Sequence, residues 1–118
     1  MSEQWGKIPG GARGRCSAVT AGGLVYAVST DPENADGIAA QTTGALRELE
    51  SLLDEAGSGK DRILQATVYL ADIADKSAMD AIWNLWIGAA KNWPQRACVG
   101  VALDTGCLFE IVVTAAVK

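Results

Sequence analysis

The sequence predicts a single α+β domain in which two helices cover a mixed, mostly antiparallel sheet. Three observations support this class: short β-rich runs with period-2 alternation, two segments with apolar residues at 3.6-residue spacing, and glycine-rich turns. The elements follow one another in the order β-β-α-β-α-β-β. A chain of 118 residues has the size of one domain, so residues 1–118 are expected to form a single unit.

A hairpin is predicted near the N-terminus. The β-rich runs Cys16–Thr20 and Leu24–Val28 are joined by Ala21, Gly22 and Gly23, and the two glycines supply the positive-φ positions of a tight turn. A further strand is expected upstream, around Gln4–Ile8, although glycine and arginine interrupt that region.

The first helix follows a turn-rich segment. Asp36 or Asn34 is expected to cap its start, and Gly57 to end it in the left-handed conformation. Its apolar stripe consists of Ile38, Thr42, Ala45, Leu46, Leu49, Leu52, Leu53 and Ala56.

The middle of the chain predicts a strand and a second helix. Lys60–Leu64 forms a connecting turn, and Gln65–Leu70 follows as a strand with Ala66, Val68 and Leu70 on one face. The second helix runs from about Asp75 to Ala90, before Pro94 interrupts the chain. Its stripe is Met79, Ile82, Trp83, Trp86 and Ala89, and the two tryptophans are interpreted as core or interface aromatics.

The last third predicts a second hairpin, with strands Arg96–Leu103 and Leu108–Val117 joined by a turn at Asp104–Gly106. Each strand contains one charged residue in an apolar run. Arg96 shares a face with Cys98 and Gly100, and Glu110 shares a face with Leu108, Val112 and Thr114. Such a lone charge is explained equally well by a solvated face, by a partner chain or by a ligand.

A register centred on Thr105 places Glu110 opposite Gly100, which leaves room beside it, and Arg96 opposite Thr114. The two charges are then roughly 13 Å apart along the strands, too far for a close ion pair. They are expected to hold opposite ends of a small ligand. A guanidinium suits a carboxylate, because its fork donates two parallel hydrogen bonds.

Composition excludes several classes of site. The chain has no histidine, which removes Ser-His and Cys-His nucleophile pairs and imidazole metal sites, so no metal and no cofactor are expected. Three widely spaced cysteines form neither a disulfide framework nor a zinc pattern, and Cys98 and Cys107 are expected to be buried thiols. A reduced, cytoplasmic protein is therefore expected.

Charge and hydropathy argue against two kinds of partner. The formal net charge is −4, with 10 Lys and Arg against 14 Asp and Glu and no basic run, which makes nucleic acid an improbable ligand. No run of 18 apolar residues is present, and Met1–Gly10 has no signal-peptide core, so no membrane association is expected.

One motif resembles a known family. The run Pro94-Gln95-Arg96-Ala97-Cys98-Val99, with Glu110 fourteen residues after the arginine, resembles the reactive-intermediate deaminases, the Rid, YjgF or L-PSP family. Matches at residues 66–72, in the helix around Met79–Trp86 and at residues 115–117 extend the resemblance from about Arg15 to the end of the chain.

The resemblance implies hydrolysis of 2-enamino or 2-imino acids to 2-keto acids and ammonia, an activity of the 2-iminobutanoate/2-iminopropanoate deaminase type. Arg96 matches the ligand of the substrate carboxylate, and Glu110 matches the residue that positions the attacking water. Cys98 matches a position whose backbone lines the pocket. The resemblance also implies a homotrimer with ligand clefts between subunits, which would bring the two distant charges to one site.

The chain departs from the family pattern around the expected pocket. Arg15 stands at the position of a family tyrosine, Val28 and Ser29 replace a Ser-Gly pair, and Asp80 stands where many members have asparagine. Arg15 and Ser29 are therefore expected to contact the substrate and to set its identity. Arg15 would favour a dianionic or bulky ligand, although a surface salt bridge explains it equally well.

Two alternative functions stay open. A non-catalytic trimer would bind small carboxylates or partner proteins through Arg96 without turnover. An endoribonuclease acting on single-stranded RNA is ranked last, because the chain is acidic and has neither histidine nor a basic stripe.

Overall fold

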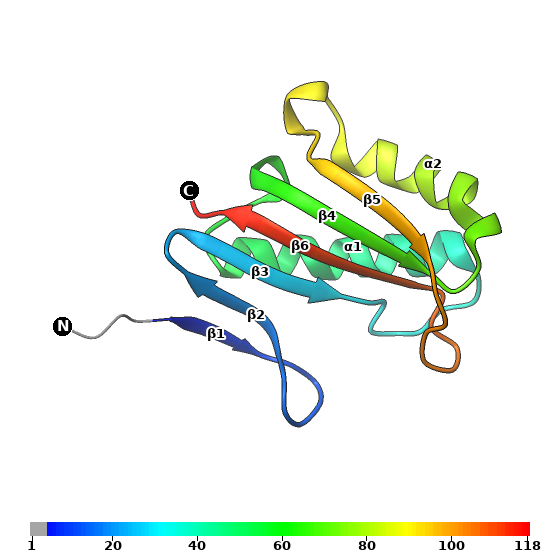
Figure 1. The fold of residues 1–118 in the computed structure, drawn as a ribbon, viewed down its shortest axis with the longest axis horizontal. Coiled ribbons are helices and arrows are strands. Elements are labelled where there is room, and N and C mark those ends of the chain that lie inside the picture. The colour runs from blue at the N-terminus through cyan, green and yellow to red at the C-terminus, as the bar shows by residue number, and fades with distance from the viewer. Residues whose placement is uncertain (1–4) are drawn as a thin grey trace.

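The computed structural model describes residues 5–118, which form one sheet and two α-helices (Figure 1). Three single-turn 3-10 helices, η1 (Lys60–Arg62), η2 (Ile73–Asp75) and η3 (Ala90–Asn92), lie in the connections. The main elements are β1 (Gly6–Pro9), β2 (Cys16–Ala21), β3 (Leu24–Ser29), α1 (Ile38–Glu55), β4 (Ile63–Leu70), α2 (Lys76–Ile87), β5 (Gln95–Gly100) and β6 (Phe109–Ala116).

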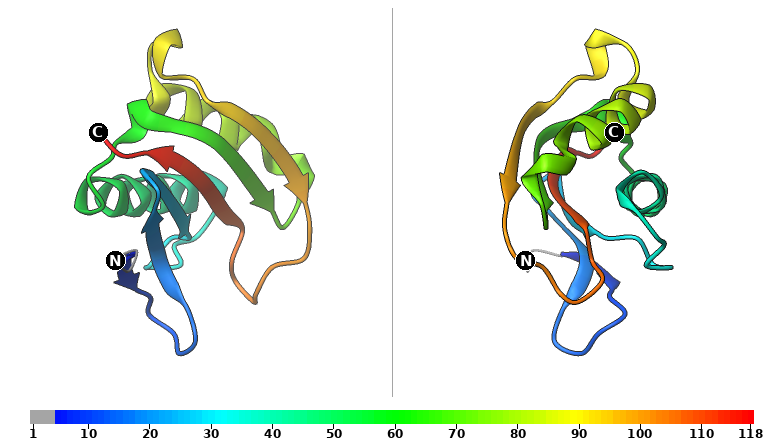
Figure 2. Two further views of the ribbon diagram at one scale, coloured as in Figure 1. Left: turned by 60° about the vertical axis from the view of Figure 1, so that its left-hand side comes forward. Right: turned by 90° about the vertical axis from the view of Figure 1, so that its right-hand side faces the viewer.

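The strands are arranged in the order β1-β2-β3-β6-β4-β5. Every neighbouring pair is antiparallel except β4 and β5, which are parallel. Both α-helices lie on the same face of the twisted sheet (Figure 2). The predicted α+β class with a mixed sheet and two covering helices is confirmed. Within residues 5–118, no helix is both long and apolar enough to span a membrane.

The predicted C-terminal hairpin is wrong. Strands β5 and β6 do not pair; β4 lies between them, parallel to β5 and antiparallel to β6. Helix α2 forms the crossover that a parallel β4–β5 pair requires. The segment between Gly100 and Phe109 is much longer than a two-residue hairpin turn, and it passes across the end of β4.

The helix face of the sheet forms the core. Along β4, Ala66, Val68 and Leu70 are each no more than 1% exposed, which confirms the predicted face of this strand. Helix α1 packs its predicted stripe onto this face, and α2 covers the end at β4 and β5. The main contributors to the core from the helices are Leu46, Leu49, Leu53, Met79, Trp83 and Ile87.

The N-terminal predictions are largely confirmed. Strand β2 pairs with β3 through the Gly22-Gly23 turn, in which both glycines have positive φ. The expected upstream strand is β1, which begins at Gly6; Gln4, the first residue predicted for it, lies outside the described residues. The predicted caps of the first helix are wrong, because Gly37 occupies the N-cap position and no side chain caps it. Asp31 instead accepts hydrogen bonds from the backbone N–H groups of Glu33 and Ala35, within the preceding turn.

Helix α1 ends at Gly57 as predicted. Gly57 has φ of +83°, the Ser58 N–H donates to the Leu53 carbonyl at 2.7 Å, and the Gly57 N–H donates to the Asp54 carbonyl at 3.1 Å. These two bonds form a Schellman motif, which satisfies the last carbonyls of the helix.

We expect Gly57→Ala to lower the free energy of unfolding by about 1 kcal/mol, because alanine is strained at positive φ. Urea denaturation at fixed protein concentration measures the change. Gly11→Ala is the matched control, since nothing lies within 4 Å of a Cβ there and its φ is outside the left-handed region. Equal effects of the two substitutions would contradict this account of the helix end.

Candidate functional site

Arg96 lies at the start of β5, on the face of the sheet that the helices cover. It pairs with Ala66 of β4, which pairs with Val113 of β6, and Val113 pairs with Ala27 of β3. Residues paired across strands share a face, and these three neighbours are at most 4% exposed. The Arg96 side chain is 18% exposed, so the guanidinium lies at the margin of the core.

Three side chains of helix α2 contact the Arg96 guanidinium. Nη2 donates to Oδ1 of Asp80 at 2.6 Å, and Nη1 lies 3.8 Å from the Sδ atom of Met79. The guanidinium carbon lies 5.2 Å from the centre of the Trp83 ring, within the range of a cation–π interaction. The orientation of Arg96 is therefore fixed by a buried helix face rather than by solvent.

Asp80 lies between two cations. Its Oδ2 accepts a hydrogen bond from Lys76 Nζ at 2.7 Å, while Oδ1 accepts from Arg96. Burial alone raises the pKa of Asp80, but the hydrogen bonds from Lys76 and Arg96 and their positive charges outweigh it, and the net pKa lies below its usual value. Asp80 is therefore ionised at neutral pH.

Cys98 points its side chain toward the core and its backbone toward the open edge of the sheet. It pairs with the fully buried Val68 and packs partly against the core. The Val101 N–H donates to the Leu70 carbonyl of β4 at 2.9 Å. Backbone groups of successive residues in a strand point in opposite directions, and Cys98 lies three residues before Val101. The N–H of Cys98 therefore points away from β4. Strand β5 is the outermost strand, so this N–H faces the open edge of the sheet. Among residues 5–118 no strand pairs with this edge of β5, so the Cys98 N–H, two residues from Arg96, is open to a ligand.

Glu110 lies on the opposite face of the sheet, which neither α1 nor α2 covers. It pairs with Tyr69 of β4, and Tyr69 pairs with Val99 of β5, which is 41% exposed. Arg15, Ser29 and Glu110 line one pocket of about 670 Å³ at the ends of β2 and β3. The two strands are no longer paired there, beyond Ala18 and Ala27. The other charged side chains that line this pocket are Glu48 and Asp104.

The structure brings Arg15, Ser29 and Glu110 together but leaves Arg96 elsewhere. The partners of Arg96 and Glu110 on β4 are Ala66 and Tyr69, three residues apart and therefore on opposite faces. The offset is roughly 10 Å along the strands and roughly 10 Å across two strand spacings. One chain therefore does not contain a site with both charges.

The predicted register between the two charged strands is wrong, because it assumed that they pair directly. Thr114 pairs with Gln65 and Tyr26, and Gly100 pairs with Leu70. Gly100 leaves room for Ile73 rather than for Glu110, since a Cβ atom at Gly100 would lie 3.0 Å from the Ile73 Cβ.

Ser29 and Arg15 occupy the pocket wall in different ways. Ser29 is 4% exposed, and its hydroxyl donates to the Ala45 carbonyl of α1 at 2.8 Å. The Ser29 hydroxyl proton is therefore already used in a hydrogen bond within the fold. Arg15 is exposed and makes no ion pair within 4.0 Å among residues 5–118, so its guanidinium is free to meet a ligand or a second chain. Val28, the other departure in this wall, is half-buried at its rim.

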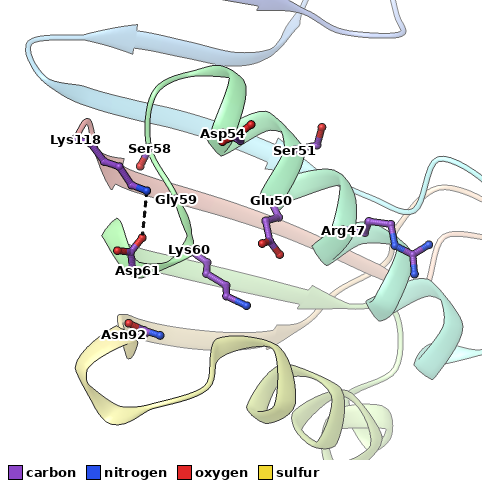
Figure 3. Close-up of a pocket in the computed structure, with 10 residues that line it drawn as sticks. All are labelled: Arg47, Glu50, Ser51, Asp54, Ser58, Gly59, Lys60, Asp61, Asn92 and Lys118. Carbon is purple, nitrogen blue, oxygen red and sulfur yellow. Dashed lines mark ion pairs between the residues drawn. The ribbon is translucent and has the colours of Figure 1, made fainter.

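A separate pocket of about 540 Å³ lies along α1, and none of the predicted site residues lines it (Figure 3). Its charges balance, because Arg47, Lys60 and Lys118 stand among three carboxylates. Lys118 pairs with Asp61 at 4.0 Å. The side chains that line this pocket therefore carry no net charge.

The cysteine thiols are the other reactive side chains of the chain. The prediction that Cys98 and Cys107 are buried thiols is wrong, because both side chains are only half-buried. The partial burial of Cys107 still raises the pKa of its thiol. Within residues 5–118, no three His, Cys, Asp or Glu side chains come together to bind a metal ion.

Sequence reasoning missed the part that α2 plays around Arg96. Asp80 was interpreted only as a departure from a family pattern, and Trp83 only as a core aromatic, which its 5% exposure confirms. The contacts of Asp80 and Trp83 with Arg96 could have been predicted from a parallel β4–α2–β5 crossover. A strand, a helix and a second strand in sequence place the helix over both strands, and Met79, Asp80 and Trp83 then share the face above the start of β5.

Comparison with known protein families supports the resemblance. The family model described as Endoribonuclease L-PSP matches residues 12–117. A RutC family protein of Haemophilus ducreyi is 40% identical over 79 residues, covering 66% of this chain and 67% of the relative. The RutC family protein YoaB of Escherichia coli is 39% identical over 88 residues, covering 73% of this chain and 76% of the relative.

Solved structures show the same fold. A YjgF family member from Neisseria meningitidis superimposes with a TM-score of 0.90 at 32% identity, covering 98% of this chain and 97% of the other. A second member of the family, from Mycobacterium tuberculosis, has a TM-score of 0.87 at 30% identity, covering 97% of this chain and all of the other.

The ion pairs of Asp80 predict a pH-dependent contribution to stability. The folded pKa is lowered, so the contribution is complete above the unfolded pKa and is lost as the pH falls through the folded pKa. We expect Asp80→Asn to lower the free energy of unfolding by about 1 kcal/mol at pH 7, and this loss to vanish in strong acid.

Urea denaturation from pH 7 to pH 2.5 measures this difference, with Asp54→Asn as the control, because Asp54 is exposed and makes no ion pair within the described chain. A difference between wild type and Asp80→Asn that grows as the pH falls would contradict the assigned pairing.

Proposed function

The chain belongs to the Rid, YjgF or L-PSP family, and from this premise we propose that it hydrolyses small 2-imino and 2-enamino acids to 2-keto acids and ammonia. Arg96 binds the substrate carboxylate, and Glu110 positions the attacking water. The reaction needs no histidine, because an imine carbon is already electrophilic and the protein supplies mainly orientation.

The observation that supports this function best is the environment of Arg96. A guanidinium oriented by Asp80 and Trp83 lies beside a backbone N–H, that of Cys98, at an open sheet edge. A carboxylate accepts hydrogen bonds from both groups, and an arginine that is already oriented loses little side-chain entropy when it binds. The arrangement suits a small α-substituted acid whose reacting carbon lies next to the bound carboxylate.

Glu110 completes the chemistry from the other side of the substrate. An enamine first tautomerises to the imine, and water then adds to the imine carbon. Glu110 accepts a proton from this water as its oxygen adds to carbon and passes it to the nitrogen, which gives a carbinolamine. It then moves the remaining hydroxyl proton to the amino group as the C=O bond forms and the C–N bond breaks, so the products are a 2-keto acid and ammonia. Proton transfer of this kind needs a carboxylate within hydrogen-bonding reach of the water.

We further propose that the site forms between two copies of the chain, in a homotrimer. Arg96 and Glu110 lie on opposite faces of one sheet, so a single substrate meets both only if a second copy contributes one of them. The uncovered face of the sheet supports such contacts, because it exposes apolar side chains, Val99 at 41% and Val112 at 40% among them. Closed rings are the usual assembly of identical chains.

The family description Endoribonuclease L-PSP names a different reaction. RNA cleavage is not part of the proposal, because the net charge is −4 and the chain lacks histidine as a general base.

Ammonia release from freshly generated 2-iminobutyrate tests the proposed function. We expect the wild type to accelerate it, and Arg96→Ala and Glu110→Gln each to lower kcat/KM by roughly a hundredfold. Arg47→Ala is the control, because Arg47 is exposed on α1 and lies in neither half of the proposed site. A wild type that binds 2-ketobutyrate through Arg96 without turnover would instead establish a non-catalytic carboxylate binder.

A further inference from the structure

The free protein already pairs Arg96 with an internal carboxylate. Asp80 accepts from Nη2 of Arg96 at 2.6 Å, and both side chains are mostly buried, 27% and 18% exposed. Asp80 therefore occupies at least one of the five guanidinium N–H donors with the same chemical group that a substrate acid presents. Substrate binding must either displace this carboxylate or share the guanidinium with it.

The charges around this pair can be counted. Lys76, Asp80 and Arg96 form a chain of two ion pairs, 2.7 and 2.6 Å long, with one carboxylate between two cations. The lowered pKa of Asp80 means that this carboxylate bears its full charge at neutral pH. The chain of three has a net charge of +1, which the carboxylate of one substrate neutralises.

Substituting Asp80 or Lys76 changes the net charge of this group of three residues in opposite directions. Asp80→Asn retains an oxygen that accepts from Arg96, but the local charge rises to +2. Lys76→Met leaves only Asp80 and Arg96 of the three charges, and the local charge falls to zero. Asp80 and Arg96 are mostly buried, so their field is less screened than that of exposed charges, whereas Lys76 is 48% exposed and its field is screened more strongly.

Resting on the proposed role of Arg96, we propose that Asp80 is a positioning residue that holds the guanidinium for the substrate and, by competing as an internal carboxylate, sets the affinity of the site for acids. Lys76 moderates this competition by taking the second oxygen of Asp80. The affinity order is then Asp80→Asn above wild type above Lys76→Met.

The test is the dissociation constant of 2-ketobutyrate, measured by titration calorimetry at low ionic strength. We expect Asp80→Asn to tighten binding by about threefold or more, and Lys76→Met to weaken it by a smaller factor of about two, because Lys76 is more exposed and acts through Asp80. Lys118→Met is the matched control for the loss of one lysine, because Lys118 is 59% exposed and, within the described chain, its ion pair is with Asp61 and not with Asp80 or Arg96; it is expected to bind like the wild type.

The role of Asp80 in orienting the Arg96 guanidinium is tested separately, by kcat. Asp80→Ala removes the acceptor as well as the charge, so we expect kcat to fall at least severalfold in this variant, whereas Asp80→Asn retains kcat and lowers KM. A residue with a merely structural role would lower stability in all three variants without moving affinity in opposite directions.

The outcomes separate this proposal from the proposed function. Binding that is lost in Arg96→Ala but equal in wild type, Asp80→Asn and Lys76→Met overturns the role of Asp80 and leaves the role of Arg96 intact. Binding that is unaffected by Arg96→Ala, or absent from the wild type and every variant, overturns both.

Discussion

The position of β4 between an antiparallel β6 and a parallel β5 determines the rest of the site. Through this strand, the register places Arg96 in the same row as Ala66 and places Glu110 in the same row as Tyr69. An odd separation along β4 puts the two charges on opposite faces, and no side-chain movement changes that. A reaction that needs both charges therefore needs a second copy of the chain, and the assembly becomes part of the chemistry.

Each half of the proposed site is built by a different part of the fold. Helix α2 fixes Arg96 through Asp80 and Trp83, and the free edge of β5 adds the backbone donor of Cys98. The other half lies where β2 and β3 separate, and contains Glu110 with an exposed arginine, Arg15. In the proposed reaction, the first half binds the carboxylate and the second provides the base, and each chain contributes both halves to different neighbours.

Local patterns predicted most of the fold, but the pairing of the last strands depended on distant parts of the chain. Alternation grouped the residues of each strand correctly, and Gly57 predicted the correct end of α1, because these are properties of adjacent residues. The predicted hairpin placed Arg96 and Glu110 on one face, and this was wrong, because the two strands pair through β4 and not with each other. The C-terminal hairpin failed because strand order depends on which apolar surfaces pack together, and two consecutive strands with an eight-residue connection are not obliged to pair. The contact between Asp80 and Arg96 was missed for the same reason, because it depends on the parallel β4–α2–β5 crossover that the predicted hairpin left out.

The central claim, that one site takes Arg96 from one chain and Glu110 from another, is tested most directly by complementation. Arg96→Ala and Glu110→Gln protein are unfolded, mixed in equal amounts and refolded together, and 2-iminobutyrate hydrolysis is compared with wild type treated in the same way. In a randomly mixed ring, about a quarter of the interfaces join an intact Arg96 to an intact Glu110, so about a quarter of the wild-type rate returns. A rate no greater than that of the two variants refolded separately would contradict the shared site.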